Sequence, residues 1–484
     1  MRFHRLLICV SWALSTSCVF AALTLSAAAF GAPTPQPSRA PVTTLGTLVQ
    51  LSGTSGCLVD RSKPVAGCKP VRALAGPAPF LGSDAIAISP DGKNVYVASS
   101  SSNAIAVFRR NPRTGKLTQG AGAAGCIAAN GAGGCGTAEG LEGPNSVAVS
   151  PDGRNVYATS LDSNAITTFA RNGSSGALTQ ASGGGCIASV ATTGCTAGRG
   201  LDGPDVVTVS PDGRNVYVGA FKGNAVAVFT RDPSTGALAQ PAGANGCISY
   251  APGAECAGGL ALGAPEGMAI SPDGDNVYVA AALSSALDVF TRNPSTGALA
   301  QAGGAAGCLV QTALAGCTTA MELGGADAVA VSPNGDDVYV TSVLSDSVTS
   351  FTRAPTTGQL VQQPGTSACV IYVLAVGCSL GQALSAPEGL AISPDGASVY
   401  AAAFGSGAID VLDRAESGAL TQKPRRPGCL TMGVPQSCSP GRGLRGASSI
   451  AVSPDGRYVY AAAFASNAVT VFKRVTKAIA SRRR

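Results

Sequence analysis

Histidine and tryptophan are almost absent from this chain of 484 residues. The one histidine, His4, and the one tryptophan, Trp12, both fall near the N-terminus, in a segment that we expect to be removed. The rest of the chain therefore has no Ser-His-Asp or Cys-His nucleophile pair, no histidine ligand for zinc and no imidazole base. Any catalysis has to use carboxylates, Arg, Lys, Tyr or a bound metal.

Charged residues are also scarce, at 12% of the chain. Of the 33 Lys and Arg residues, two lie in the N-terminal segment and six lie between Lys473 and Arg484. The remaining 25 are slightly outnumbered by the 27 acidic residues. A nucleic-acid reader carries a basic face, so this composition argues against nucleic acid as a partner. The basic tail, 475–484, is a solvated end or a weak surface anchor.

Long apolar runs are confined to the N-terminus. Residues 1–31 have a positive start and a mostly apolar stretch, with small residues before cleavage points after Ala29 or Gly31, which is typical of a secretory signal. The alternative is an uncleaved anchor helix. A Pro-rich linker, 32–46, follows. No later stretch is long and apolar enough to span a membrane, so we expect a secreted or extracytoplasmic protein with no transmembrane span after signal cleavage.

A repeated turn organises the rest of the chain. Ser-Pro-Asp-Gly begins at Ser89, Ser150, Ser210, Ser271, Ser393 and Ser453, and a variant with Asn334 begins at Ser332. Residues 205–240 show that each repeat holds four short β-branched or apolar runs separated by turns, which is the pattern of strands. Seven such units predict an all-β, seven-bladed β-propeller with four-stranded blades over residues 47–474. The repeat of about 60 residues exceeds the usual blade, which indicates an inserted loop.

The two ends of the propeller are offset. Thr47–Gln50 matches Lys116–Gln119, the outermost strand of the first full repeat, whereas the last repeat stops after its third strand, near Lys473. We therefore expect the N-terminal strand to close the last blade, which leaves the ring without an unpaired edge.

Cysteines follow the same period. Cys9 and Cys18 fall in the signal, and the other fourteen form one pair per repeat. Even numbers at a fixed spacing in an exported chain predict disulfides within each loop. Metal thiolates are the alternative, but they favour short Cys-x-x-Cys steps and often histidine. The expected bridges join Cys57 with Cys68, Cys126 with Cys135, Cys186 with Cys195, Cys247 with Cys256, Cys308 with Cys317, Cys369 with Cys378, and Cys429 with Cys438.

The pattern SPDGRNVYV…NAVAVF.R.PSTG.L resembles the YVTN and lactonase-like seven-bladed propellers, the superfamily of 6-phosphogluconolactonase-type enzymes. The resemblance implies the fold and raises lactone hydrolysis as an activity. Family enzymes that rely on a histidine have no equivalent here. The Ser-Pro-Asp-Gly aspartates are interpreted as turn residues.

One polar position recurs at the start of each innermost strand, five residues before the Ser-Pro turn. It is occupied by Asp84, Asn145, Asp205, Glu266, Asp327, Glu388 and Ser448. Because innermost strands line the central channel, we expect this carboxylate ring at one mouth. Its five acidic members could bind Ca²⁺ or Mg²⁺, the only cofactors that the sequence suggests, or a polar ligand. The alternative is that each carboxylate caps backbone N–H groups of the next blade.

Apolar residues should surround the same mouth in the loops between second and third strands: Ser100, Leu161, Phe221, Ala282, Val343, Phe404 and Phe464. They could hold a ligand or pack under the disulfide loops. Arg199, Arg442 and Arg445 are candidates to bind an anion or a lactone carbonyl, or are solvated.

These features favour a ligand-binding or protein-interaction scaffold, whose partner is a small molecule or a protein at the propeller face. A lactone hydrolase that uses mouth carboxylates or a bound metal is the alternative.

Overall fold

The computed structural model describes residues 45–77, 84–181, 185–251, 255–433 and 437–476. The chain divides into two units, Met1–Val42 and Thr43–Arg484, and the described residues all belong to the second. The expected signal, nearly all of the linker and most of the basic tail fall outside the described residues. Within these residues, no helix has the length and apolar character needed to cross a membrane.

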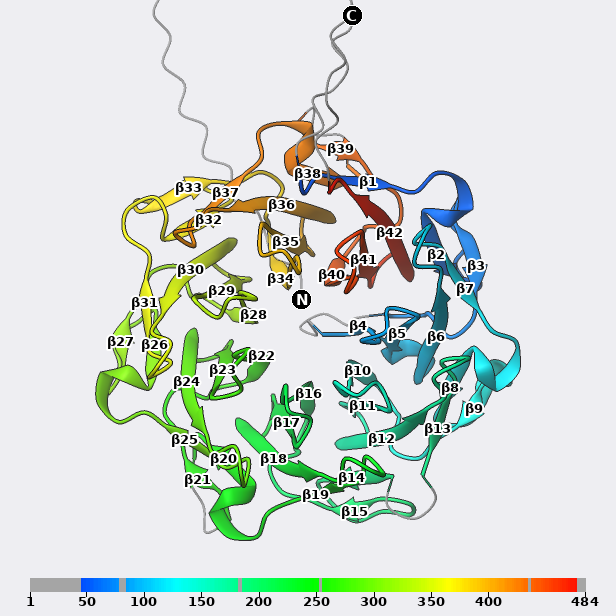
Figure 1. Cartoon of the computed structure of the whole chain (residues 1–484), viewed down its shortest axis with the longest axis horizontal. Coiled ribbons are helices and arrows are strands. Elements are labelled where there is room, and N and C mark those ends of the chain that lie inside the picture. Colours follow the sequence, from blue (N-terminus) through cyan, green and yellow to red (C-terminus); the bar gives the residue numbers. More distant parts are fainter. Residues whose placement is uncertain (1–44, 78–83, 182–184, 252–254, 434–436, 477–484) are drawn as a thin grey trace, which may run out of the picture. The chain divides into compact units, whose positions relative to one another are not determined.

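Seven β-sheets surround one axis, as Figure 1 shows, and the expected all-β seven-bladed propeller is confirmed. The innermost strands are β4 (Ile86–Ile88), β10 (Pro144–Val149), β16 (Pro204–Val209), β22 (Pro265–Ile270), β28 (Ala326–Val331), β34 (Pro387–Ile392) and β40 (Ala447–Val452). The second strands are β5 (Asn94–Ser99), β11 (Asn155–Ser160), β17 (Asn215–Ala220), β23 (Asn276–Ala281), β29 (Asp337–Ser342), β35 (Ser398–Ala403) and β41 (Tyr458–Ala463). The third strands are β6 (Ala104–Arg110), β12 (Ala165–Arg171), β18 (Ala225–Arg231), β24 (Ala286–Arg292), β30 (Ser347–Arg353), β36 (Ala408–Arg414) and β42 (Ala468–Arg474). Blades are numbered below by their innermost strands in chain order.

The fourth position of each blade is divided, which refines the expected four-stranded blade. Two short strands pair with opposite ends of the third strand. The first of them are β7 (Leu117–Gln119), β13 (Leu178–Gln180), β19 (Leu238–Ala239), β25 (Leu299–Gln301), β31 (Leu360–Gln362) and β37 (Leu420–Gln422). The second are β8 (Cys126–Ala128), β14 (Cys186–Ala188), β20 (Cys247–Ser249), β26 (Cys308–Val310), β32 (Cys369–Ile371) and β38 (Cys429–Thr431).

The inserted loop then returns as a parallel strand at the outer edge of the sheet. These edge strands are β9 (Gly136–Thr137), β15 (Thr196–Ala197), β21 (Ala257–Gly258), β27 (Thr318–Thr319), β33 (Cys378–Leu380) and β39 (Ser439–Pro440). They lie directly after, or begin at, the second cysteine of each loop.

All seven expected disulfides are present, with Cα–Cα distances from 4.5 to 4.9 Å. Each bridge joins the two arms of its own loop near the start of the edge strand, so it fixes that strand to the blade. The metal-thiolate alternative is thereby excluded for these cysteines. The bridges join Cys57 with Cys68, Cys126 with Cys135, Cys186 with Cys195, Cys247 with Cys256, Cys308 with Cys317, Cys369 with Cys378, and Cys429 with Cys438.

Blade 7 combines both ends of the propeller, as expected. β1 (Leu48–Gln50) and β2 (Cys57–Asp60) pair with β42, and β3 (Lys69–Val71) pairs with β2 as the edge strand. The register aligns Leu48 with Arg474. The N-terminal strand therefore closes the last blade and the ring.

Apolar side chains fill the space between neighbouring blades. Each second strand carries a fully buried tyrosine, and six of the third strands place a fully buried phenylalanine beside them. Strand alternation sends such residues to both faces of a blade, and both faces are covered by neighbours. These buried layers form the core of the propeller.

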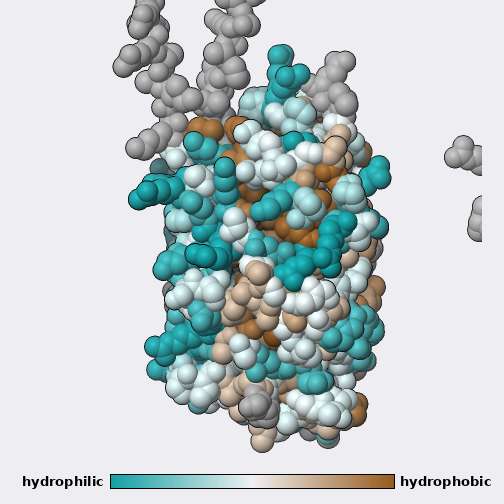
Figure 2. All heavy atoms as spheres, turned by 90° about the vertical axis from the view of Figure 1, so that its right-hand side faces the viewer, coloured by the Kyte–Doolittle hydropathy of each residue, from teal (hydrophilic) through white to brown (hydrophobic). Residues whose placement is uncertain are grey.

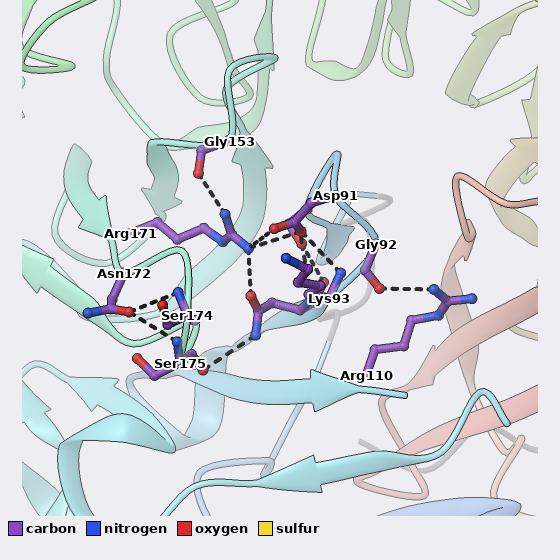
Figure 3. Close-up of polar contacts among 12 residues, drawn as sticks. Asp91, Gly92, Lys93, Arg110, Gly153, Arg171, Asn172, Ser174 and Ser175 are labelled. Atoms are coloured by element: carbon purple, nitrogen blue, oxygen red, sulfur yellow. Dashed lines mark hydrogen bonds and ion pairs between the residues drawn. The ribbon is translucent and has the colours of Figure 1, made fainter. Parts of the chain in front are cut away.

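Polar clamps join each blade to the one before it. Arg171, at the end of β12, donates to the Asp91 carboxylate at 2.9 Å and to the Tyr96 hydroxyl at 3.0 Å, both in blade 1. The Tyr96 hydroxyl donates in turn to the Gly176 carbonyl of blade 2. Figure 3 shows Arg171 between Asp91 and the Gly153 carbonyl. The Ser-Pro-Asp-Gly aspartate is thus a turn residue, as expected, and also an ion-pair partner.

The clamp recurs around the ring. Its other ion pairs are Arg231–Asp152, Arg292–Asp212, Arg353–Asp273, Arg414–Asp337, Arg474–Asp395 and Arg110–Asp455. For Asp395, burial raises the pKa, but hydrogen bonds from Arg474 and Ser393 outweigh this effect and lower it to about 2. Every junction between blades therefore contains a charged pair with a largely buried arginine.

Candidate functional site

The carboxylate ring begins where the chain crosses from the outer edge of one blade to the centre of the next. A left-handed residue precedes the inner strand in each described crossing, for example Gly203 before Asp205 and Ala264 before Glu266. Alanine rarely adopts a positive φ, so Ala264 and its counterpart Ala386 are held there by their surroundings. The chain turns at these points to place the ring residues at the start of the inner strands.

The loop residues that the sequence analysis expects around the ring, which we call the apolar rim, lie next to it. The backbone N–H groups of Phe221, Phe404 and Phe464 donate to the carbonyls of Gly203, Ala386 and Gly446, each at 2.8 Å. Each of these carbonyls lies two residues before a ring residue. The three phenylalanines are half-buried, as are Ser100, Leu161, Ala282 and Val343 in the equivalent loops. The rim and the ring therefore lie side by side at the starts of the inner strands.

Glycine allows two of the inner strands to approach unusually closely. A Cβ atom on Gly267 would lie 2.0 Å from the Asp327 carbonyl oxygen, and one on Gly389 would lie 2.5 Å from the Ser448 carbonyl oxygen. Only glycine fits at such positions. Because Glu266 precedes Gly267, the close approach brings the Glu266 side chain against Asp327.

Burial and mutual repulsion raise the pKa values of the ring acids. Burial, followed by the nearby charge of Asp327, raises the pKa of Glu266 far above its usual range, and burial does the same for Asp327. Their carboxyls lie close enough to interact, and two carboxylates in such contact cannot both ionise without a large cost. The pair therefore holds a proton at neutral pH.

Asp205 and Asp84 complete the acidic arc. Burial and the charges of Asp327 and Asp84 raise the pKa of Asp205, although Asn145 donates a hydrogen bond to its carboxylate at 2.5 Å. Burial raises the pKa of Asp84 to about 6. Glu388 is buried and adds to the raised pKa of Glu266. Five carboxyl groups thus converge in the ring, while Asn145 and Ser448 are its buried neutral members.

The predicted arginines take different positions. Arg199 donates to the carbonyls of Glu255 and Pro241, and it lines a groove of about 670 Å³ between blades 2 and 3. Arg442 donates to the carbonyls of Gly67, Leu51 and Gly53. Arg445 is exposed in the crossing into blade 7. The first two guanidinium groups hold loop backbones together.

A metal at the ring remains a prediction. Among the described residues, no three His, Cys, Asp or Glu side chains are placed so that they could hold one ion. The ring is therefore best described as a set of carboxylic acids with shared or retained protons.

Two buried acids were missed by the sequence analysis. Asp288 in β24 and Asp410 in β36 are fully buried and each accepts a hydrogen bond from a glutamine, Gln301 or Gln422. Burial raises both of their pKa values. Equivalent strands carry threonines that donate to backbone carbonyls, such as Thr167 to Gly140 and Thr349 to Glu322. The signal in the sequence that could have found them is an acidic residue inside an otherwise apolar strand.

Fold and site together define a disulfide-stapled, seven-bladed propeller with a ring of buried acids at the starts of its inner strands. A family model described as "Lactonase, 7-bladed beta-propeller" matches residues 82–192 and, overlapping with them, 137–246. The resemblance to the lactonase-like propellers is therefore confirmed. The sequence has no significant match among curated proteins.

Two solved structures with a TM-score of 0.50 support the fold. A "putative 6-phosphogluconolactonase" from Bacteroides fragilis is 19% identical with a TM-score of 0.50, covering 69% of this chain and 81% of that one. A functionally unknown protein from Desulfotomaculum acetoxidans is 14% identical with a TM-score of 0.50, covering 80% and 96%. The periplasmic gluconolactonase PpgL from Pseudomonas aeruginosa is 19% identical with a TM-score of 0.49, covering 78% and 93%.

Proposed function

We propose that this chain is an exported binding scaffold whose channel mouth takes a polyhydroxylated ligand of the sugar or sugar-lactone class. The observation that carries the proposal is the convergence of Asp84, Asp205, Glu266, Asp327 and Glu388 at one mouth. Acids that keep their protons in a buried site cost stability at neutral pH. Such groups are typical of functional sites.

The chemistry of the mouth suits this ligand class. Neutral carboxylic acids donate and accept hydrogen bonds, and sugar hydroxyls and lactone oxygens need both. The half-buried rings of Phe221, Phe404 and Phe464 offer apolar surface next to these polar groups, a combination common in ligand sites. Seven disulfides indicate an oxidising, extracytoplasmic environment, which is consistent with export.

Titration calorimetry with glucono-δ-lactone, gluconate and glucose tests this proposal. We expect binding to be weakened about tenfold or more by Glu266→Gln combined with Asp327→Asn. Asp288→Asn is the matched control, because it also removes a buried acid of raised pKa but lies in β24, away from the ring. Absence of binding to all three probes, or equal losses in both variants, would show that the mouth is not the site.

Lactone hydrolysis is the second candidate, and the acid pair at the mouth favours it. The ionised member of the Glu266–Asp327 pair could take a proton from water as its oxygen attacks the lactone carbonyl carbon. The ring C–O bond then breaks, and the leaving oxygen receives the proton held by the other member. The family description "Lactonase" supports the same chemistry.

Hydrolysis of glucono-δ-lactone, followed against the spontaneous rate, separates the two candidates. Since the described residues contain no histidine, we expect little hydrolysis above background near neutral pH. Turnover at ordinary enzyme rates, of about 1 per second or more, that is lost in Glu266→Gln would establish the hydrolase instead.

A further inference from the structure

The disulfide loop of blade 5 exposes an unusual amount of apolar side chain. Between Cys369 and Cys378 the chain reads Val-Ile-Tyr-Val-Leu-Ala-Val-Gly. Tyr372, Val373, Leu374 and Val376 are exposed to 44, 67, 68 and 95%, and Leu380 in the following edge strand to 60%. The Tyr372 N–H donates to the Asp346 carbonyl at 2.9 Å. The loop is therefore held in place with its apolar residues outward, and we call these five residues the blade 5 patch.

The equivalent loops show that this exposure is not a property of the repeat. Among their described residues, each of the loops in blades 2, 3, 4 and 6 exposes one large apolar side chain: Val190, Tyr250, Leu314 and Met432. The loop in blade 7 carries Asp60, Arg61 and Lys63 instead. Figure 2 shows the outer side of blades 7 and 1, where hydrophilic residues are interspersed with apolar ones. Large exposed apolar patches on soluble proteins mark interaction sites.

Charge is absent from the whole surrounding segment. No Asp, Glu, Lys or Arg occurs between Arg353 and Glu388. A two-fold contact brings the same patch of both copies together, so a patch with net charge would meet like charge. A segment without charges avoids this repulsion. A membrane surface with anionic lipids would instead attract Lys and Arg, and the patch has none.

The edge strand of the same blade is also unprotected. Sheet edges are usually blunted by charge, proline or shortness. Five of the other six edge strands have two residues, one of them with Pro440, and β3 has three residues that include Lys69 and Pro70. β33 has three residues, Cys378, Ser379 and Leu380, and no such device. No described strand pairs with its outer side, although Cys378 forms an isolated antiparallel bridge with Ser367, so Ser379 and Leu380 are the residues left for a new pairing.

We infer that blade 5 is the contact surface for a second copy of this chain. Two β33 strands pair antiparallel about a two-fold axis, and the two blade 5 patches cover one another. The patch supplies buried apolar area, and the strand edges supply self-complementary backbone hydrogen bonds. The contact lies on the outer rim of the propeller, and the inference is independent of the ligand proposed for the channel.

The repeat provides matched controls for the test. Val373 and Val190 both lie four residues after the first cysteine of their loops and are exposed to 67 and 69%. Tyr372 and Tyr250 form a second matched pair, three residues after that cysteine and exposed to 44 and 49%. Val373→Glu and Val190→Glu therefore introduce the same charge at equivalent surface positions of different blades.

Sedimentation velocity of the full mature chain, from about 1 to about 100 µM, measures the association. We expect a dimer that Val373→Glu weakens about tenfold or more and that Val190→Glu leaves unchanged. Leu380→Lys should act as Val373→Glu does, and unchanged melting temperatures would show that the variants remain folded.

Three results would overturn the inference. The wild-type chain could be monomeric throughout the range, or Val373→Glu could leave the dimer intact. The third is a monomer that binds phosphatidylcholine vesicles and loses this binding in Val373→Glu but not in Val190→Glu, which would assign the patch to a lipid surface.

Discussion

At the scale of the residue, single buried acids are expected to have the largest effects on the free energy of unfolding. Asp288 and Asp410 stand where blades 2, 5 and 7 have a threonine that donates to a carbonyl and where blades 1 and 3 have an alanine. A protonated carboxyl can make the same donation, whereas a carboxylate cannot. Burial explains why their pKa values rise and why they keep a proton in the folded chain.

Asp288→Thr should therefore stabilise the protein at neutral pH. A folded-state pKa above the unfolded value gives a contribution that is fully present below the unfolded pKa of about 4 and lost as pH rises through the folded one. We expect a gain of about 1–3 kcal/mol at about pH 8 and a much smaller one at about pH 4. Urea unfolding at both pH values measures it, and an equal effect at the two would contradict a protonated Asp288.

A cation bound at the ring would compete with the protons of its acids. Calcium at the mouth would have to displace the proton held by Glu266 and Asp327, so its effect should increase with pH. If the ring is a cation site, millimolar calcium raises the melting temperature more at about pH 8 than at about pH 5, and Glu266→Gln with Glu388→Gln abolishes the rise. An unchanged melting temperature at both pH values would remove the metal hypothesis.

Junctions between blades are the features that matter at the scale of the element. Six of the seven clamps use the aspartate of the Ser-Pro-Asp-Gly turn, but blade 5 has Asn334 there. Its carboxylate comes from Asp337, at a position held by Asn94, Asn155, Asn215 and Asn276 in other blades, and pairs with Arg414. The charge has moved by three residues, and the ion pair is kept.

Restoring the usual arrangement, with the aspartate in the Ser-Pro-Asp-Gly turn, should therefore leave the free energy of unfolding nearly unchanged. Asp337→Asn alone leaves the buried Arg414 guanidinium without a carboxylate and should cost about 3 kcal/mol. Adding Asn334→Asp should recover most of this loss, as measured by unfolding in guanidinium chloride. A double variant as unstable as the single one would show that the two positions are not interchangeable.

The sequence predicts the repeating elements well because each depends on local patterns. Strand runs, turn residues and cysteine spacing each recur seven times, and the ring position follows from the repeat alone. The clamps were missed because Arg171 and Asp91 are 80 residues apart, which is not the repeat length, and their contact depends on how blades stack. The divided fourth strand was missed because both of its pieces are only two to four residues long.

Closure governs the behaviour of the whole molecule. β1 pairs with β42, and the Gln50 side chain hydrogen-bonds to both the N–H and the C=O of Arg442 at 3.0 Å. The equivalent glutamines, such as Gln119 with Arg72, make the same pair of bonds in other blades. The last blade therefore depends on residues from both ends of the chain.

Removing β1 should loosen the ring. A mature chain that begins at residue 52 should melt at least several degrees below one that begins at residue 45, because blade 7 loses a strand and the Gln50 contacts. Differential scanning calorimetry of the two chains makes the comparison. Equal melting temperatures would show that β2 alone is sufficient to close the blade.

The same closure sets the order in which the protein can be completed during synthesis. β1, β2 and β3 are made first, yet the strand that they join, β42, is made last, more than 400 residues later. Six blades can assemble as their strands emerge, while the first strands wait. A chain that ends early leaves these strands without a sheet and the ring open. An unfinished copy therefore differs from a finished one in its exposed edges, which are the features that proteases and chaperones detect.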